Sequence, residues 1–254
     1  MSRVLAVIPA RWASTRFPGK MLHPLCGRPL LAWVIDRVRQ ARRVDGVLVA
    51  TDDARIAALA AAMGVEAVHT DPALRSGTDR VAAAVRGRGV EAVVNVQGDE
   101  PLIDPGLVDA LADVVATPRG VAMATAAAPL ADVRSAADPS VVKVVCDRAG
   151  RALYFSRAAI PHPRDGGQPP GPYLRHIGIY AYRTAFLRRF VAAPPCAMEQ
   201  AEALEQLRAL YLGARIRVLS VAAAGPGVDT PADVAPVEAA LRRAGLVPSG
   251  GGVR

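Results

Sequence analysis

Two stretches of the sequence carry side chains suited to binding a polyphosphate and a metal ion. The first is the segment 9–20, which follows the apolar run Val4–Ile8 and holds two arginines, Ser-Thr, Pro-Gly and Lys20. A loop of this kind after a buried strand offers cations and backbone N–H groups to phosphate oxygens. Lys20 is one of only two lysines in a chain with 29 arginines, and an ammonium acts on phosphate as a flexible point charge. We therefore predict a phosphate-binding loop; the alternative is a solvated lysine.

The second stretch is Asn95–Pro101, with the sequence Asn-Val-Gln-Gly-Asp-Glu-Pro. It directly follows an apolar run, so the Asp99 carboxylate is expected at the carboxyl end of a strand. Mg²⁺ on a nucleotide usually takes one or two carboxylates together with phosphate oxygens. We predict that Asp99 binds Mg²⁺ and that Gln97 donates to a sugar or phosphate oxygen; the alternative is that Asp99 only caps a turn.

Two further segments are ambiguous when they are considered alone. Asp229, in Gly-Val-Asp-Thr-Pro, is the candidate second metal ligand, but Asp before Thr-Pro is also a common start of a helix. Ser76, in Arg-Ser-Gly-Thr-Asp-Arg, has a small hydroxyl that could contact a base or ribose. A plain helix cap explains Ser76 equally well.

The elements that must position these residues alternate in type through the first half of the chain. Helical patterns, including one that starts after Pro29 and one that ends near Gly64, separate apolar runs that read as strands. The predicted strands are Val4–Ile8, Val47–Ala50, Val65–His69, Ala92–Val96 and Val121–Ala128. This alternation predicts a parallel sheet wrapped by helices, with ligands at the carboxyl ends of the strands.

The second half of the chain is less regular. Its predicted strands are 141–146, 152–155, 177–182 and 216–221, and its predicted helices are 184–191, 198–211 and 231–243. The Gly- and Pro-rich segment 163–172 is expected to form a mobile loop, and 245–254 a frayed tail. We predict a single domain over 1–254, with a smaller sub-region at about 130–200.

Composition limits the possible partners. The net charge is +8 and the pI is about 10.1, but the cations are scattered and aromatic residues are only 4%. Few bases could therefore stack on aromatic side chains, which favours an anionic small substrate over nucleic acid. The three cysteines lack CxxC spacing, so neither a disulfide framework nor a zinc site is predicted. This cysteine usage predicts a cytoplasmic location. No apolar run suits a signal peptide or approaches the ~18 residues of a membrane span.

Together, these motifs resemble the 3-deoxy-manno-octulosonate cytidylyltransferases, or CMP-KDO synthetases, where KDO is the sugar acid 3-deoxy-D-manno-octulosonate. The similarity extends over nearly the whole chain. The loop 8–20 and the segment 95–101 are shared with other sugar nucleotidyltransferases, and the resemblance also includes 76–78 and 227–231. The segments more specific to the KDO enzymes are Ala152–Arg157, Leu174–Tyr180 and Leu204–Arg208.

The resemblance implies a reaction of CTP with KDO that gives CMP-KDO and pyrophosphate for lipopolysaccharide synthesis. It implies a three-layer, Rossmann-like nucleotide-diphospho-sugar transferase fold, whose central sheet is mostly parallel, and a homodimer formed through the smaller region, which also binds the sugar. By analogy, Arg11 and Lys20 hold the triphosphate, and Asp99 and Asp229 hold Mg²⁺. The residues expected to contact cytosine are Arg16, Ser76 and the Ala10 backbone. Those expected to line the sugar-acid pocket are Gln97, Arg157, His176, Tyr180, Glu205 and Gln206.

Taken singly, the sugar-pocket residues also have ordinary explanations, such as surface ion pairing, a core histidine or a solvated helix face. One position departs from the family, because Leu74 replaces the usual histidine two residues before Ser76 and is followed by Arg75. Because this position lies near the expected nucleotide pocket, the substitution affects the expected contacts to cytosine and not the predicted reaction class. Two alternatives remain: a cytidylyltransferase for another ulosonic acid, an amino analogue of KDO or a phosphonate, and a non-catalytic nucleotide- or nucleic-acid-binding module. The paired acidic motifs argue against the module.

Overall fold

The computed structural model describes residues 3–117, 121–130, 132–165, 167, 169 and 171–247. The chain forms two compact units. The first unit comprises Leu5–Arg86, Asn95–Asp109 and Gly225–Arg254, and the second comprises Met1–Val4, Gly87–Val94 and Ala110–Ala224. No helix in the described part of the chain is long and apolar enough to cross a membrane.

The first unit is built on parallel strands, as the alternating pattern predicts. Strand β4 (Gly46–Thr51) pairs in parallel with both β1 (Val4–Ala10) and β5 (Glu66–His69). Every residue of β1 is buried, which explains its unbroken apolar sequence. The helices of this unit are α1 (Leu30–Val38), α2 (Ala54–Ala62), α3 (Gly77–Ala84) and α8 (Val234–Arg243).

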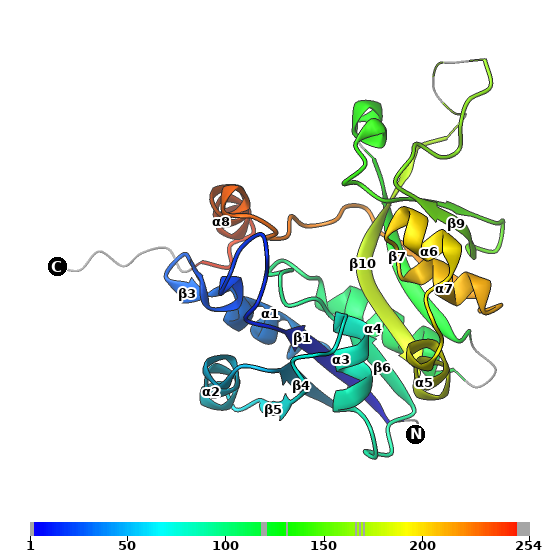
Figure 1. Ribbon diagram of the computed structural model, residues 1–254. Helices are drawn as coiled ribbons and strands as arrows, with labels where there is room; N and C mark the ends of the chain where they lie inside the picture. The colour runs from blue at the N-terminus through cyan, green and yellow to red at the C-terminus, as the bar shows by residue number, and fades with distance from the viewer. Residues whose placement is uncertain are drawn as a thin grey trace. The chain divides into compact units, whose positions relative to one another are not determined.

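The helix boundaries follow the local sequence signals. Pro29 precedes α1 as predicted, and Gly64 follows α2 with a φ of +69°. In Figure 1, α8 lies beside the hairpin of β2 (Pro24–Leu25) and β3 (Arg28–Pro29). Its apolar face closes a buried cluster that consists of Leu25, Leu30, Trp33, Val228, Val237 and Leu241. This packing holds the segment just before Asp229 against the core.

The second unit contains the less regular half of the chain. Strand β10 (Leu174–Arg183) pairs antiparallel with β7 (Met123–Pro129), and it runs beside β7 as a long curved ribbon in Figure 1. On the other side of β7, β11 (Ile216–Ser220) pairs in parallel. The antiparallel hairpin of β8 (Lys143–Cys146) and β9 (Ala152–Ser156) joins β10. The helices are α5 (Thr184–Ala192), α6 (Ala197–Glu202) and α7 (Gln206–Tyr211).

The remaining elements complete a mixed α/β fold whose central sheet is mostly parallel, as predicted. Strand β6 (Ala92–Asn95) and helix α4 (Pro105–Ala116) lie where the chain passes from one unit to the other. The short 3₁₀ turns in the described ranges are η1 (Lys20–Leu22), η2 (Val133–Ala137) and η3 (Pro231–Asp233). Of the predicted tail at 245–254, residues 248–254 lie outside the described residues, as do positions 166, 168 and 170 of the predicted loop.

One predicted element is wrong: the continuous helix at 198–211 is broken into α6 and α7. Ala203 adopts a left-handed conformation with a φ of +49°, which ends α6. The break allows Arg208 of α7 to reach Glu199 of α6, with an Nη2–Oε1 distance of 2.8 Å. In one straight helix these residues would be about 13 Å apart along the axis. The break in the helical pattern and this buried ion pair therefore occur together. The predicted helix at 231–243 likewise begins as η3 before α8.

Candidate active site

A polar pocket opens at the carboxyl end of β1, and all its lining residues belong to the first unit. They come from the loop after β1, the start of α3, the segment after β6 and the segment before η3. The lining residues are Pro9, Ala10, Arg11, Ser14, Thr15, Arg16, Lys20, Met21, Leu74, Arg75, Ser76, Gly77, Arg80, Gln97, Gly98, Asp99 and Asp229. The predicted nucleotide and metal residues thus share one pocket.

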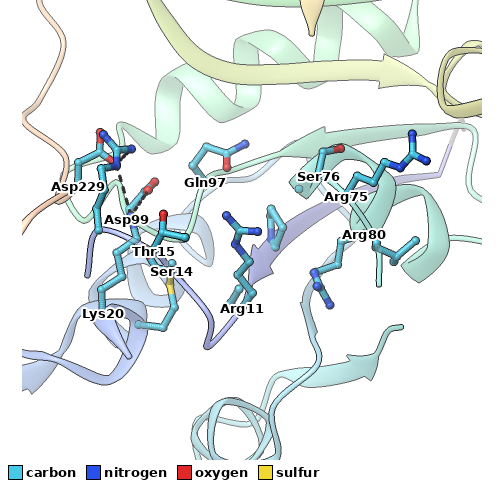
Figure 2. Close-up of a pocket in the computed structure, with 17 residues that line it drawn as sticks. Arg11, Ser14, Thr15, Lys20, Arg75, Ser76, Arg80, Gln97, Asp99 and Asp229 are labelled. Atoms are coloured by element: carbon cyan, nitrogen blue, oxygen red, sulfur yellow. Dashed lines mark hydrogen bonds and ion pairs between the residues drawn. The ribbon is translucent and has the colours of Figure 1, made fainter. Parts of the chain in front are cut away.

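Figure 2 shows how the labelled side chains divide along this pocket. Lys20, Asp99 and Asp229 lie together at one end. Ser76 and Arg75 lie at the other end, and Gln97 and Arg11 lie between the two groups. One end of the pocket therefore contains the two carboxylates and Lys20, and the other end is formed by residues at the start of α3.

Lys20 is buried rather than solvated, with only 6% of its surface exposed. Its Nζ atom donates to Asp99 Oδ2 at 2.6 Å and to the Val228 carbonyl at 2.9 Å. It also lies 3.6 Å from Asp229 Oδ1. The alternative of a chance surface lysine is wrong, because this ammonium links the two predicted metal ligands.

Two glycines allow the backbone to approach closely enough to build this end. Gly19, directly before Lys20, has a φ of +71°, a conformation that side chains with a Cβ atom rarely adopt. At Gly98, a Cβ atom would lie 2.9 Å from Met21 Sδ and 3.1 Å from the Pro9 carbonyl oxygen. The Val228 N–H donates to the Asp99 carbonyl at 2.9 Å, which holds the two acidic segments together.

Asp229 does not cap the following helix. That role falls to Thr230 and Asp233, which form a reciprocal capping box at the start of η3. The Asp229 carboxylate instead accepts from Arg16 Nη2 at 3.0 Å, and its side chain is 56% exposed. Asp229 therefore offers its carboxylate to the pocket, and the capping alternative is not what the structure shows.

The acidic end suits a hard cation such as Mg²⁺. Asp99 and Asp229 face the same ammonium, and both carboxylates are partly exposed, at 27% and 56% of the side chain. Within the described ranges no group of three or more His, Cys, Asp or Glu residues could hold a metal ion. An ion bound here would therefore complete its coordination with water or phosphate oxygens, which is the usual arrangement for Mg²⁺.

The opposite end is formed by the start of α3. Ser76 is the N-cap residue, and its Oγ accepts from the Asp79 N–H at 3.1 Å. Arg80, one turn later, is buried and donates to Asp52 Oδ2 at 2.8 Å and to Thr70 Oγ1. Ser76 thus combines capping with a place in the pocket wall, so the two explanations for it are compatible.

The pocket is electropositive, with five cationic side chains against two carboxylates. Arg11 and Arg75 are exposed, and neither has a hydrogen-bond or ion-pair partner among the described residues. Gln97 donates from Nε2 to Asn95 Oδ1 at 3.1 Å, which orients its amide. An excess of positive charge with two free guanidinium groups favours a polyanionic ligand.

Of the predicted sugar-pocket residues, all except Gln97 belong to the second unit, and three of them form a connected group. Tyr180 Oη donates to Gln206 Oε1 at 3.2 Å, and the His176 and Tyr180 rings lie 5.4 Å apart. The Gln206 amide nitrogen is buried and has no hydrogen-bond partner among the residues that the structure describes. Burial raises the pKa of Tyr180, so its phenol remains a neutral donor.

The other two are placed differently. The Arg157 guanidinium donates to the carbonyl oxygens of Glu202 at 2.7 Å and Pro139 at 2.9 Å. Its own carbonyl accepts from Lys143 Nζ at 2.5 Å. Arg157 therefore connects the end of α6 to the segment that follows η2. Glu205 lies at the start of α7, with one carboxylate oxygen 3.9 Å from Arg208.

His176 is a buried, neutral imidazole. The Thr125 hydroxyl lies 2.9 Å from His176 Nε2 and donates to the Ile179 carbonyl at 2.8 Å. The Ile177 carbonyl also lies 3.2 Å from this hydroxyl oxygen. With the single hydroxyl proton donated to one of these two carbonyls, Thr125 accepts from His176 Nε2–H, and this hydrogen-bond network assigns the tautomer. Burial, together with the neighbouring Arg175, lowers the pKa of His176 to about 3 from the ordinary 6.5.

The shift of His176 predicts an acid-dependent loss of stability. Below pH 6.5 the unfolded chain takes up a proton on this imidazole that the folded chain refuses until about pH 3. Stability therefore falls as the pH drops through this window, by up to about 1.4 kcal/mol per pH unit. Urea unfolding at several pH values should show a shallower dependence for His176→Asn than for the wild type. An NMR titration of the imidazole with a midpoint near 6.5 would contradict the prediction.

Several pocket residues carried no role in the sequence interpretation. Ser14, Thr15 and Arg80 line the pocket, and the hydroxyl pair inside the basic loop is the signal that could have indicated the first two. The burial of Arg80 depends on Asp52, which is distant in sequence, so no local pattern marks it. Leu74 and Arg75 also line the pocket, so the departure from the family pattern lies in the pocket wall.

Comparisons with known proteins agree with this geometry. The cytidylyltransferase family profile matches residues 5–216. The 3-deoxy-manno-octulosonate cytidylyltransferase of Anaeromyxobacter sp. (strain Fw109-5) is 54% identical over 92% of this chain and 95% of its own length. The enzyme of the same name from Bdellovibrio bacteriovorus is 46% identical over 96% of this chain and 100% of its own length.

A solved structure shows the same relationship in three dimensions. It is described as CMP:2-keto-3-deoxy-manno-octonic acid synthetase complexed with CTP, and it is 41% identical to this chain. The two superpose with a TM-score of 0.91, over 96% of this chain and 100% of the other. The chain belongs to the cytidylyltransferase family and, within it, to the 3-deoxy-manno-octulosonate cytidylyltransferases.

Proposed function

We propose that this protein transfers the cytidylyl group of CTP to KDO, giving CMP-KDO and pyrophosphate. The observation that carries the proposal is the buried Lys20, which is held 2.6 Å from Asp99 and 3.6 Å from Asp229 at the end of a basic loop. Relatives named for this reaction cover nearly the whole chain. The excess of cations in the pocket suits a triphosphate.

The proposed chemistry is an in-line attack of the anomeric hydroxyl of KDO on the α-phosphorus of CTP. The new bond joins the sugar oxygen to this phosphorus, the bond from the α-phosphorus to the bridging oxygen of the β-phosphate breaks to release pyrophosphate, and the hydroxyl proton is released to solvent. Reactions of this kind depend mainly on positioning and charge neutralisation. Arg11 and Lys20 would bind the phosphates, and Lys20 would stabilise charge that develops on the leaving group.

The remaining residues would hold the substrates. The Ala10 backbone, Arg16 and Ser76 are proposed to contact cytosine, and Gln97 a sugar or phosphate oxygen. Asp99 and Asp229 would hold Mg²⁺, which supplies charge neutralisation and a lower pKa for the attacking hydroxyl. The proposed sugar-acid contacts are Gln97, Arg157, His176, Tyr180, Glu205 and Gln206.

The cellular setting is part of the same proposal. The CMP-KDO that enzymes of this family make is used in lipopolysaccharide assembly, and we propose that the product of this protein has the same use. CTP is a cytoplasmic nucleotide, so a cytoplasmic location is proposed as well. We also propose a homodimer formed through the region around residues 130–200, with no nucleic-acid or membrane partner.

Pyrophosphate release tests the proposal directly. The purified protein with Mg²⁺ and CTP should release pyrophosphate only when KDO is added, with ATP, GTP and UTP as controls. Release with another ulosonic acid, an amino analogue or a phosphonate, but not with KDO, would retain the reaction class and change the acceptor. No release with any acceptor, together with thermal stabilisation by RNA or DNA, would favour a binding module.

A further inference from the structure

The loop that carries Arg11, Arg16 and Lys20 is closed by Trp12. The Trp12 carbonyl accepts from the Ser14 N–H at 2.9 Å and from the Gly19 N–H at 3.1 Å. The indole lies against Gly19, where a Cβ atom would be only 2.8 Å from Trp12 Cη2. Both the backbone and the side chain of Trp12 therefore tie the start of the loop to its end, one residue before Lys20.

A side chain from α2 stacks on the same indole. The Cζ atom of Arg55 lies 3.3 Å from the centre of the Trp12 ring. Arg55 is held in turn by Asp53, which accepts from its Nε at 3.0 Å and from its Nη2 at 2.6 Å. Asp53 is also the N-cap of α2, since it accepts from the Arg55 N–H at 2.9 Å. The stacked guanidinium is thus fixed to a helix start.

These three residues lie outside the pocket wall. Arg11 and Ser14, on either side of Trp12 in sequence, line the pocket, whereas Trp12, Asp53 and Arg55 do not. Arg55 therefore does not line the pocket in which the ligand is proposed to bind. Its contacts are with the loop and with Asp53.

We propose that Asp53, Arg55 and Trp12 form a clamp that holds the loop 11–20 in the conformation that binds CTP. This inference rests on the proposed function of the pocket. Without the clamp, the loop would have to be ordered when the nucleotide binds, and that loss of entropy would weaken binding. Arg55 and Trp12 are positioning residues, since they act on CTP only through the loop.

The first test is a double-mutant cycle on the Kd for CTP, measured by calorimetry without KDO. Arg55→Ala should raise Kd by roughly two- to fivefold, the usual effect of a cation–π contact at a partly exposed site. Trp12→Ala should raise Kd by about tenfold, because the indole packing on Gly19 is lost as well. Adding Arg55→Ala to Trp12→Ala should have no further effect. Additive effects in the double mutant would overturn the clamp.

Arg55→Lys separates the clamp from simple charge attraction. Lysine keeps the positive charge but loses the planar group that stacks and binds Asp53 through two nitrogens. The clamp predicts that Arg55→Lys binds CTP more weakly than the wild type. If Arg55→Lys binds like the wild type while Arg55→Ala does not, long-range charge explains the effect and the clamp is wrong.

The chain offers a closely matched control. Arg28 Cζ lies 4.7 Å from the ring centre of the other tryptophan, Trp33, and Arg28 pairs with Asp36 at 2.5 Å. None of these three residues lines the pocket. Arg28→Ala removes the same kind of Arg–Asp–Trp arrangement, and it should leave the Kd for CTP unchanged.

Amide hydrogen exchange of the ligand-free protein tests the clamp independently of CTP. Arg55→Ala should speed exchange in the segment 13–19, and Arg28→Ala should not. If the wild type fails to bind CTP, the proposed function is wrong, and the exchange comparison alone then decides whether the clamp exists. Unchanged exchange in Arg55→Ala would overturn it.

Discussion

Replacing Asp99 with asparagine is expected to lower kcat by roughly 10²–10³-fold, the loss typical of removing one group that stabilises transition-state charge. The KM for CTP should change far less, because Arg11 and the rest of the basic loop remain. Asparagine keeps the shape of the side chain but loses the charge that faces Lys20 at 2.6 Å. It also loses the charge proposed to hold Mg²⁺. Pyrophosphate release at saturating CTP and KDO, together with a separate Kd for CTP, measures both effects.

Asp36→Asn is the matched control for this change. Asp36 also forms a close ion pair, since its Oδ2 lies 2.5 Å from Arg28 Nη2. Both residues belong to the same unit as Asp99 but lie outside the pocket. Its substitution should leave kcat within about twofold of the wild type, as expected for an exposed pair. An unchanged kcat in Asp99→Asn would remove both the metal role and the chemical role assigned to this carboxylate.

Arg208→Met is expected to lower the free energy of unfolding by about 3–5 kcal/mol, the largest stability effect among the proposed substitutions. Arg208 is 7% exposed and donates to Glu199 from Nε and from Nη2, both at 2.8 Å. It also donates to the Ala193 carbonyl at 3.0 Å. Without it, the carboxylate of Glu199, which is 8% exposed, loses its guanidinium partner inside the second unit. The free energy of unfolding in urea measures this loss.

A second variant separates the unpaired charge from lost packing. The double substitution Glu199→Met with Arg208→Met removes both charges and should recover most of the stability, because no buried ion is left. Arg242→Met, at an exposed pair with Glu238 3.2 Å away, should cost less than about 1 kcal/mol. If the double variant is as unstable as Arg208→Met, the carboxylate is not the source of the loss.

The sequence alone determined the class of the fold and the location of the chemistry. Unbroken apolar runs such as β1 predict buried parallel strands, and the helical patterns between them predict α1 and α2, because burial imposes a period that is visible locally. The cations of 11–20 and the carboxylate of Asp99 follow such strands. The carboxyl ends of parallel strands meet at one edge of a sheet, so the sequence predicts that they share a site.

Only the tertiary structure decided between alternatives that are locally equivalent. Asp229 and Thr230 are both residue types that commonly cap helices. In the structure Thr230 is the cap, because it forms a capping box with Asp233. The Asp229 carboxylate therefore faces Lys20 instead. The helix at 198–211 breaks at Ala203, and the break brings Glu199 and Arg208 together inside the protein. The contact of Arg55 with Trp12 joins residues far apart in sequence. Ion pairs and stacking contacts of this kind depend on distances through space, and they leave no periodic pattern along the chain.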